Sequence, residues 1–245
     1  MENNNEEKTI LVVDDEQPIR ELLAYHLDKE GFKVLEAIDG EQAIKMVAEK
    51  KPDLVLLDIM LPKIDGINVC KHIRYTLKML EMPILMISAK GDETDKIVGL
   101  EIGADDYITK PFQIREVIAR IKANLRKVES SRTAVKMDNS VITKVGDLTI
   151  DSSRREVKVR GKVIELTKKE FDVLKFLADK KGEVVSREEL LKEIWGYGDY
   201  VGEIRTIDVT MARLRDKIER KKGTHEFLAT KRGVGYYITD NTKKE

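Results

Sequence analysis

The first half of the chain alternates short apolar runs with stretches of helical spacing, and this alternation constrains the fold more than any other feature. Between the first two runs, apolar residues recur at the helical interval of Ile19, Leu22, Leu23 and Leu27. Strands that alternate with helices build right-handed βαβ units, and therefore a parallel sheet with helices on both faces. The pattern predicts a five-stranded doubly wound α/β domain over residues 8–127. The expected strands are 9–13, 33–37, 53–57, 83–87 and 104–108, and the expected helices include 18–29, 41–50, 92–102 and 113–127.

A different pattern begins at residue 145, after a polar stretch at 128–144 that we interpret as a linker. VGDLTIDSSRREVKVRGKVIEL alternates around two turn signals and predicts a small antiparallel sheet. The closing FLATKRGVGYYI has the signature of a hairpin. We therefore expect a second domain of the α+β class over residues 145–240. Its expected helices are 167–180, 186–195 and 203–220, and capping boxes are expected at Thr167 with Glu170 and at Ser186 with Glu189.

Composition limits the classes of protein to which the chain can belong. No run approaches the roughly 18 apolar residues of a membrane span, and the polar N-terminus MENNNEEK is unlike a signal peptide, so we expect no membrane association. Cys70 is the one cysteine, which fits a reducing cytoplasm. Residues 1–128 hold 19 Lys and Arg against 24 Asp and Glu, whereas residues 129–245 hold 26 against 21. Net charges of −5 and +5 are compatible with nucleic-acid binding by the second half.

Polar side chains follow four of the five expected strands. Asp14 and Asp15 follow the first strand, Asp58 the third, Ser88 the fourth and Lys110 the fifth. Parallel α/β sheets bind ligands beyond the carboxyl ends of their strands, so these side chains should converge. Three carboxylates suit a hard cation such as Mg²⁺ and would leave Asp58 free to attack phosphorus, with Lys110 and Ser88 stabilising the added oxygens. Singly, each residue is equally compatible with a solvated turn, a helix cap or a surface lysine; the combination favours a site.

The segments VVDDE, LLDIMLPKIDG, ISAK and DDYITKPF closely resemble the receiver domain of two-component response regulators, a flavodoxin-like fold. The resemblance covers residues 8–127. It implies Asp58 as the phosphoacceptor and Asp14 with Asp15 as the acidic pair. It also implies Mg²⁺ bound by Asp15, Asp58 and the backbone carbonyl of Met60. Ser88 is then the switch hydroxyl, Tyr107 the switch aromatic and Lys110 the phosphoryl contact, and the Lys110–Pro111 bond is expected to be cis.

The rival class is a phosphatase that also forms an aspartyl-phosphate. Enzymes of the haloacid dehalogenase type need a second acid two residues after the nucleophile, and Met60 stands there. No Walker A loop occurs, and His26, His72 and His225 lack metal or triad spacing. We therefore expect a protein that is not an enzyme, beyond Mg²⁺-dependent phosphotransfer to itself and autodephosphorylation.

The last expected helix has one apolar and one polar-basic line. Ile207, Met211, Leu214 and Ile218 recur at core spacing. Beside them, Thr206, Thr210, Arg213 and Lys217 offer hydroxyls and positive charge, with Arg205 and Arg215 nearby. Such a helix can enter a major groove, although periodicity alone fits an ordinary solvated face equally well.

ELTKKEFDVLKFLADKKGEVVSREELLKEIWG, RTIDVTMARLRDKIE and KRGVGYYI resemble the winged-helix effector domain of the OmpR/PhoB subfamily over about residues 145–239. The resemblance implies a recognition helix at about 203–219 and an RNA polymerase contact in the loop at 195–204. Thr210 stands where members often have His, and Tyr237 where a basic residue is common, which bears on the target sequence. The implied DNA-facing residues are Arg205, Thr210, Arg213 and Arg215 on the helix, and Thr230 and Arg232 on the wing.

The same resemblance implies a homodimer that forms on phosphorylation. Family-like interface pairs are Lys96 with Glu116, Asp106 with Arg120, and Asp105 with Lys127, where an Arg is usual. Exposed pairs contribute only about 0–1 kcal/mol each, but repetition by two-fold symmetry can fix the geometry of a dimer. The sequence thus predicts a cytoplasmic transcription factor that a sensor histidine kinase phosphorylates at Asp58, and that then dimerises and binds promoter DNA. The alternatives are a regulator that binds DNA without phosphorylation and a metal-dependent phosphohydrolase.

Overall fold

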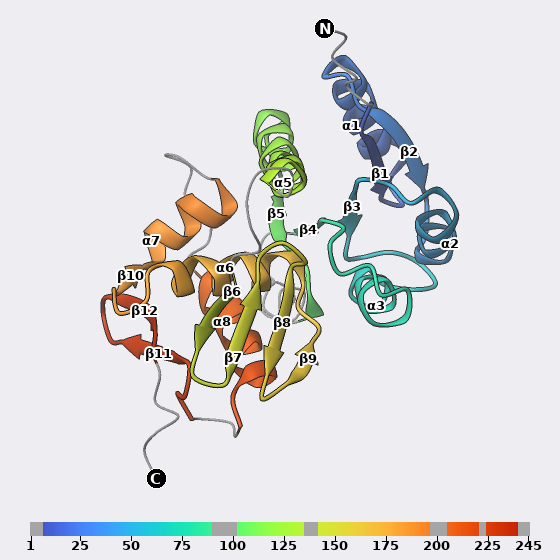
Figure 1. The fold of residues 1–245 in the computed structure, drawn as a ribbon. Coiled ribbons are helices and arrows are strands. Elements are labelled where there is room, and N and C mark those ends of the chain that lie inside the picture. Colours follow the sequence, from blue (N-terminus) through green and yellow to red (C-terminus); the bar gives the residue numbers. More distant parts are fainter. Residues whose placement is uncertain (1–6, 90–101, 135–141, 197–204, 221–223, 240–245) are drawn as a thin grey trace, which may run out of the picture. The chain divides into compact units, whose positions relative to one another are not determined.

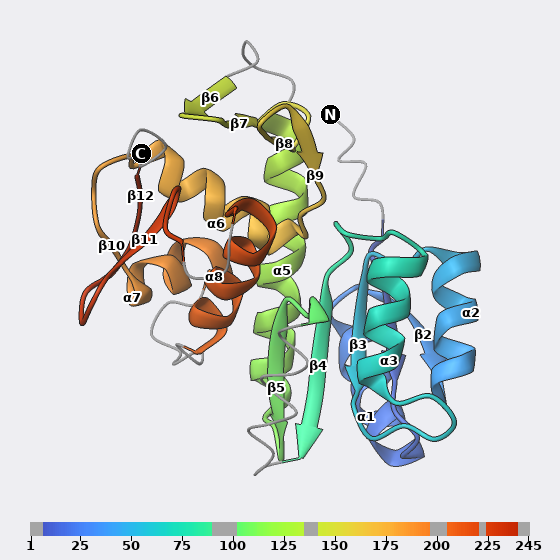
Figure 2. The ribbon, with the colours of Figure 1, turned by 90° about the horizontal axis from the view of Figure 1, so that it is seen from below.

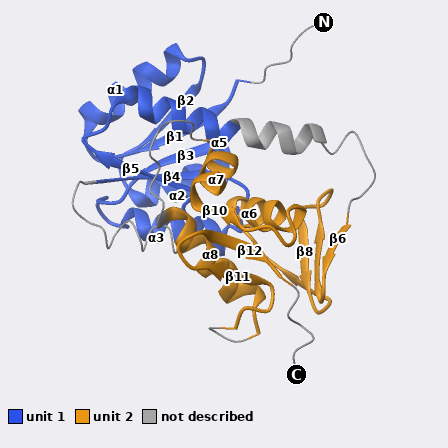
Figure 3. Ribbon diagram, turned by 90° about the vertical axis from the view of Figure 1, so that its left-hand side faces the viewer, with its two compact units in different colours: residues 1–125 blue, residues 126–245 orange. Residues whose placement is uncertain are grey.

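The computed structural model describes residues 7–89, 102–134, 142–196, 205–220 and 224–239. The chain divides into two compact units, Met1–Leu125 and Arg126–Glu245 (Figure 3). Within the described residues, none of the helices combines the length and the apolar character that crossing a bilayer requires.

Unit 1 is built on the predicted five-stranded parallel sheet, in the order β2-β1-β3-β4-β5 (Figures 1 and 2). Each strand lies within two residues of its predicted position, because the apolar runs fill strands that are buried on both faces. All four pairings are parallel, so every strand ends at the same edge of the sheet. The strands are β1 (Thr9–Val13), β2 (Lys33–Ala37), β3 (Leu54–Asp58), β4 (Ile84–Ala89) and β5 (Asp106–Lys110).

Helices cover both faces of this sheet. Ile10 and Leu56 belong to the apolar core shared with α1 (Gln17–Lys29) and α5 (Ile114–Ala134). Leu11 belongs to a second core, shared with α2 (Gly40–Lys50) and α3 (Gly66–Lys71), which continues as a short π-helical segment, η1 (His72–Thr76). The predicted doubly wound architecture is therefore confirmed. Apart from Ile102, the predicted helix at 92–102 lies outside the described residues.

The predicted linker is shorter than expected at both ends. Helix α5 runs on to Ala134, so the first seven residues of the stretch 128–144 are helical. This segment, VESSRTA, has no apolar face but also no Gly or Pro to end the helix. At its other end the stretch already forms a strand, since β6 begins at Ile142.

Unit 2 joins two antiparallel sheets and three helices around one apolar core, in which Trp195 is 1% exposed. The predicted sheet and closing hairpin are confirmed, and a two-residue strand adds to the hairpin. A Cβ atom on Gly235 would lie 1.9 Å from the Val185 carbonyl oxygen, so this pairing needs glycine. The elements are β6 (Ile142–Val145), β7 (Leu148–Asp151), β8 (Glu156–Val159), β9 (Lys162–Ile164), α6 (Lys168–Asp179), β10 (Val185–Ser186), α7 (Arg187–Leu190), η2 (Leu191–Trp195), α8 (Arg205–Ile218), β11 (Leu228–Lys231) and β12 (Gly235–Ile238).

The capping box predicted at Thr167 is complete, whereas at Ser186 the hydroxyl caps the helix and the Glu189 carboxylate pairs with Lys180 instead. The Thr167 backbone N–H donates to Glu170 Oε2 at 2.7 Å, and the Glu189 N–H donates to Ser186 Oγ at 3.0 Å. Satisfying these N–H groups fixes where α6 and α7 begin, because the first turn of a helix has no internal acceptors for them.

A fully buried arginine ties the end of η1 to the start of β4 and β5. Arg74 is 0% exposed, and its Nη2 lies 2.7 Å from Asp105 Oδ2. Its other N–H groups donate to the carbonyl oxygens of Gly103, Met79 and Met82. The same Asp105 oxygen accepts the Ile84 N–H at 2.9 Å. One side chain thus links the loop before β4 to the loop before β5.

We expect Arg74→Met to lower the free energy of unfolding by about 3–5 kcal/mol, because it leaves the Asp105 carboxylate buried without its cation. Urea denaturation of the intact chain, followed by circular dichroism, measures this loss. Lys122→Met is the matched control: it breaks the half-exposed ion pair with Glu30 and should cost no more than about 1 kcal/mol. Equal losses for the two variants would contradict a structural role for the buried pair.

Candidate functional site

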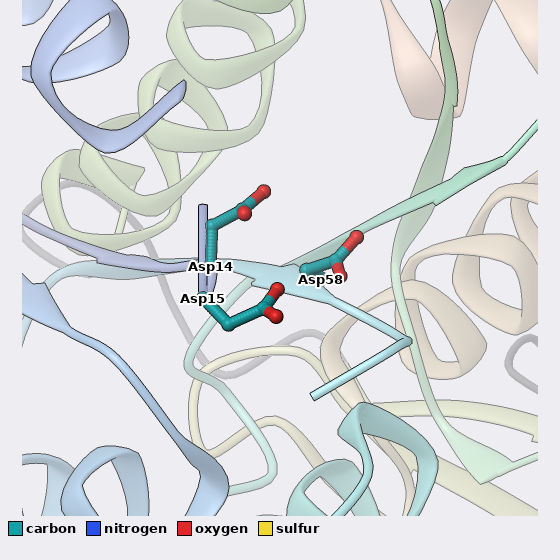
Figure 4. Close-up of side chains that lie close together, drawn as sticks. All are labelled: Asp14, Asp15 and Asp58. Carbon is teal, nitrogen blue, oxygen red and sulfur yellow. The ribbon is translucent and has the colours of Figure 1, made fainter. Parts of the chain in front are cut away.

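Three carboxylates meet at the carboxyl edge of the sheet in unit 1. Because β1 and β3 are adjacent and Val13 pairs with Leu57, Asp14 and Asp15 emerge beside Asp58. One oxygen from each of the three groups lies within 4.8 Å of the others (Figure 4). Asp14 and Asp58 are 0% and 3% exposed, whereas Asp15 is exposed. The predicted convergence of these side chains is therefore present.

The ammonium group of Lys110, at the end of β5, lies between the two buried carboxylates. Its Nζ is 2.9 Å from Asp14 Oδ2 and 3.2 Å from Asp58 Oδ1. Burial raises the pKa of the Asp58 carboxyl, against the opposing charge of Lys110 and with the help of Asp14. Burial by itself would lower the pKa of Lys110. The hydrogen bond that Lys110 donates to Asp14 and the charge of Asp58 outweigh burial, so the pKa is raised. The lysine therefore stays protonated, whereas burial disfavours the anionic form of the Asp58 carboxyl beside it.

Backbone and glycine contacts hold these carboxylates in place. The Glu16 N–H donates to Asp14 Oδ1 at 2.9 Å, and the Met60 N–H donates to Asp58 Oδ2 at 3.2 Å. The chain after β3 turns back so closely that a Cβ atom on Gly66 would lie 2.1 Å from the Asp58 carbonyl oxygen. Glycine is required there, because any larger residue would push the end of β3 aside.

Sequence reasoning missed two residues at this site. Glu16 Oε1 lies 3.3 Å from Lys110 Nζ, and Arg20 Nη1 donates to the carbonyl oxygens of Asp14 and Asp15 at 2.8 and 3.0 Å. The one available signal was the third consecutive acid of the DDE run. Arg20 gave none, since an arginine on an exposed helix is ordinary.

The two predicted switch residues occupy adjoining strands. Ser88 follows Ile87, the register partner of Asp58, and is 1% exposed. Tyr107, on β5, is 6% exposed, so its ring already lies inside unit 1. The Lys110–Pro111 peptide bond is cis, as predicted.

The donor set fits a hard divalent cation. Carboxylate oxygens within 4.8 Å of one another are the ligands that Mg²⁺ prefers. Asp15 opens the cluster to solvent, so an ion can enter from that side.

Two of the arginines predicted to contact DNA, Arg213 and Arg215, are bound to other residues of unit 2. Arg213 Nη2 lies 2.7 Å from Oε1 of the fully buried Glu170. Arg215 donates through Nε to the Leu228 carbonyl oxygen at 3.1 Å and through Nη2 to Thr230 Oγ1 at 2.7 Å. Burial lowers the pKa of the Arg215 guanidinium. Both arginines are half-buried and held at the two sides of α8.

The other predicted contacts differ in exposure. Thr210 is 4% exposed and its hydroxyl donates to the Thr206 carbonyl oxygen at 2.8 Å, so its side chain faces the core and not a ligand. The prediction treated the Thr210 hydroxyl as a polar group on the solvent side of the helix. A threonine hydroxyl can instead donate to a carbonyl of its own helix, which allows the side chain to be buried. Arg232 is exposed in the hairpin turn between β11 and β12. Arg205 begins α8, and its side chain lies outside the described part.

Two family models match the chain in series. The model described as "Response regulator receiver domain" matches residues 10–122, and that described as "Transcriptional regulatory protein, C terminal" matches residues 161–238. The response regulator DrrB of Thermotoga maritima, described as an OmpR/PhoB homolog, is 33% identical over 95% of this chain and 99% of its own, with a TM-score of 0.49. A RitR mutant is 27% identical over the same shares, with a TM-score of 0.76.

The chain belongs to the response regulators of the OmpR/PhoB type. It is therefore a transcription factor of a two-component system rather than an enzyme, with a receiver domain that phosphorylation regulates and a DNA-binding domain. The receiver implies a histidine kinase as partner, and the effector implies promoter DNA.

The predicted interface residues of this response regulator are largely paired within one copy. Arg120 Nη1 lies 3.0 Å from Asp106 Oδ1, and its Nη2 lies 2.8 Å from Glu116 Oε1. Asp105 is 1% exposed and bound to Arg74, so it presents little surface to a second copy. Its burial was not predicted, because two consecutive acidic residues normally indicate an exposed segment. Lys96 and the side chain of Lys127 lie outside the described part.

We expect Asp58→Asn to raise the melting temperature of the metal-free response regulator at pH 7. Because the folded pKa of Asp58 is raised, its protonated form is the stabilising one below the unfolded pKa of about 3.9, and that stability is lost as pH rises through the folded pKa. Asparagine mimics the neutral form, so its advantage should vanish at low pH. Calorimetry against pH, with the exposed Asp28→Asn as control, measures the difference. If Asp58→Asn melted at a lower temperature than the wild type at pH 7, the conclusion that burial raises the pKa of Asp58 would be wrong.

Proposed function

We propose that Asp58 accepts the phosphoryl group that switches this response regulator. The observation that carries the proposal is the position of Lys110, whose ammonium faces both Asp58 and Asp14 at 3.2 and 2.9 Å. A carboxylate whose charge is only partly balanced is a usable nucleophile, and a lysine beside it can stabilise the new phosphoryl oxygens. A turn or cap carboxylate has no need of such a partner.

In the proposed reaction, an Asp58 carboxylate oxygen attacks the phosphorus atom of the phosphohistidine of a sensor kinase. A P–O bond forms and the P–N bond to histidine breaks, with the imidazole as leaving group. Asp14, Asp15, Asp58 and the Met60 carbonyl would hold Mg²⁺, which supplies charge to the transferring oxygens. Lys110 moves from its carboxylate contacts to the phosphoryl group, and hydrolysis of the acyl phosphate later resets Asp58.

The proposed response joins the receiver to the promoter. Phosphorylation adds about 1.5–2 negative charges and new acceptor oxygens, toward which Ser88 turns. Two receivers then associate with Asp106, Glu116 and Arg120 near the contact, and the effectors bind promoter DNA and RNA polymerase in the cytoplasm. Two effectors linked in this way bind repeated half-sites with a raised effective concentration.

We expect acetyl phosphate to label the wild-type chain in the presence of Mg²⁺ with an acid-stable, base-labile acyl phosphate, and Asp58→Asn to abolish the label. Asp53→Asn, at the other end of the same strand region, is the control and should label normally. Phosphate-affinity electrophoresis and intact mass measure the product. A label that survives Asp58→Asn places the phosphoacceptor elsewhere, and release of many phosphates per chain from small esters would favour a phosphohydrolase.

We expect phosphorylation to tighten promoter binding by about 10-fold or more, since one coupling of 1–3 kcal/mol corresponds to roughly 5- to 150-fold. Gel-shift titrations with and without phosphodonor measure this change. Asp58→Asn should bind like the unphosphorylated chain under both conditions. Equal affinity with and without the donor would favour the alternative, a regulator whose receiver serves dimerisation alone.

A further inference from the structure

Among the described side chains of α8, which begin at Thr206, none at the centre of the outward face is basic. On that face Ala212 and Asp216 are exposed and Val209 is half-buried. They lie at i, i+3 and i+7, so they form one line along the helix. The described part of this face therefore presents apolar groups and the Asp216 carboxylate. Asp208, also exposed on α8, accepts hydrogen bonds from Arg187 Nε and the Tyr236 hydroxyl. The side that packs into the core consists of Ile207, Met211, Leu214 and Ile218, each 1% exposed or less.

The arginines that flank this line are held by partners in the same unit. Arg213 Nη2 lies 2.7 Å from Oε1 of the fully buried Glu170, and swinging Arg213 outward would leave that carboxylate with one cation fewer. Arg215 uses Nε and Nη2 on Leu228 and Thr230. A guanidinium reads guanine with two N–H groups of its fork; the Arg215 fork is engaged through Nε and Nη2, and Arg213 is held through Nη2. Both arginines are therefore better suited to act as fixed positive charges.

The surroundings of the line match a DNA groove. Positive charge stands at both of its sides, and exposed Lys231 and Arg232 extend the Arg215 side through Thr230 into the hairpin turn. In a major groove, phosphates lie on both sides and base edges in the middle, so positive flanks with an uncharged or acidic centre are complementary to it.

We propose that Val209, Ala212 and Asp216 read the bases of the DNA half-site. Val209 and Ala212 would contact the C5-methyl groups of thymine, and Asp216 would accept the N4–H of cytosine, which are the contacts that apolar and carboxylate side chains make in the major groove. The Asp216 carboxylate also repels phosphate, so it disfavours binding positions in which the centre of α8 lies against the DNA backbone. The inference rests on the proposed promoter binding, and it states which residues would determine the base sequence that is bound.

Selection of bound duplexes from a random library by the full-length phosphorylated chain tests this inference. The wild type should enrich half-sites that contain thymine and cytosine. Asp216→Asn should lose roughly 5- to 100-fold of its preference for cytosine at one position and gain adenine there, because an amide pairs with adenine. Ala212→Arg should replace one thymine preference by guanine. Glu183→Gln makes a comparable charge change at an exposed site outside α8 and should leave the preferences unchanged.

Each outcome bears on a distinct claim. If Asp216→Asn and Ala212→Arg keep the wild-type base preferences, the inference is wrong even though the chain binds promoters. If the wild type enriches no sequence, the proposed DNA binding itself fails. Circular dichroism checks that each variant is folded.

Discussion

The ammonium of Lys110 allows two carboxylates to be buried side by side at the edge of the receiver sheet. Two like charges separated by a few ångströms repel strongly once water is removed, and each also loses its hydration. Lys110 contacts both Asp14 and Asp58, and it reaches them because β5 ends at the same edge as β1 and β3. The strand order and the parallel direction of all five strands thus matter for charge balance as well as for the apolar core.

Buried carboxylates elsewhere in the chain also have cations, but those sites are closed. Asp105 has Arg74 and a backbone N–H on one oxygen. Glu170 has Arg213, Lys217 and the Thr167 N–H. These contacts fix loops and helix ends. The cluster around Asp58 differs, because burial raises the pKa of its carboxyl and Asp15 keeps it open to solvent. Similar electrostatics therefore gives structural anchors at Asp105 and Glu170 and, in the proposed function, a reactive group at Asp58.

The sequence was most informative where a residue's place follows from its strand. Asp14, Asp58, Ser88 and Lys110 each follow an apolar run, and parallel order brings such positions together without any knowledge of side-chain contacts. Arg74 could not be predicted as buried, since its partners are loop carbonyl groups, which any sequence provides, and Asp105, which is 31 residues away. The end of α5 was misplaced because a polar stretch without Gly or Pro is compatible with either helix or linker.

Helix α8 shows the limit of periodicity more sharply. Its spacing correctly gave the core face. It also placed Thr210 and Arg213 on a binding face, whereas Thr210 bonds within its own helix and Arg213 pairs with Glu170. The positive charge of the second half is thus partly committed to internal pairs, and the exposed centre of α8 is nearly uncharged or acidic. Exposed cations such as Lys231 and Arg232 stay available to phosphates, and linking two effectors adds their contacts at a raised effective concentration. In the proposed mechanism, dimerisation of the receiver therefore decides whether a promoter is occupied.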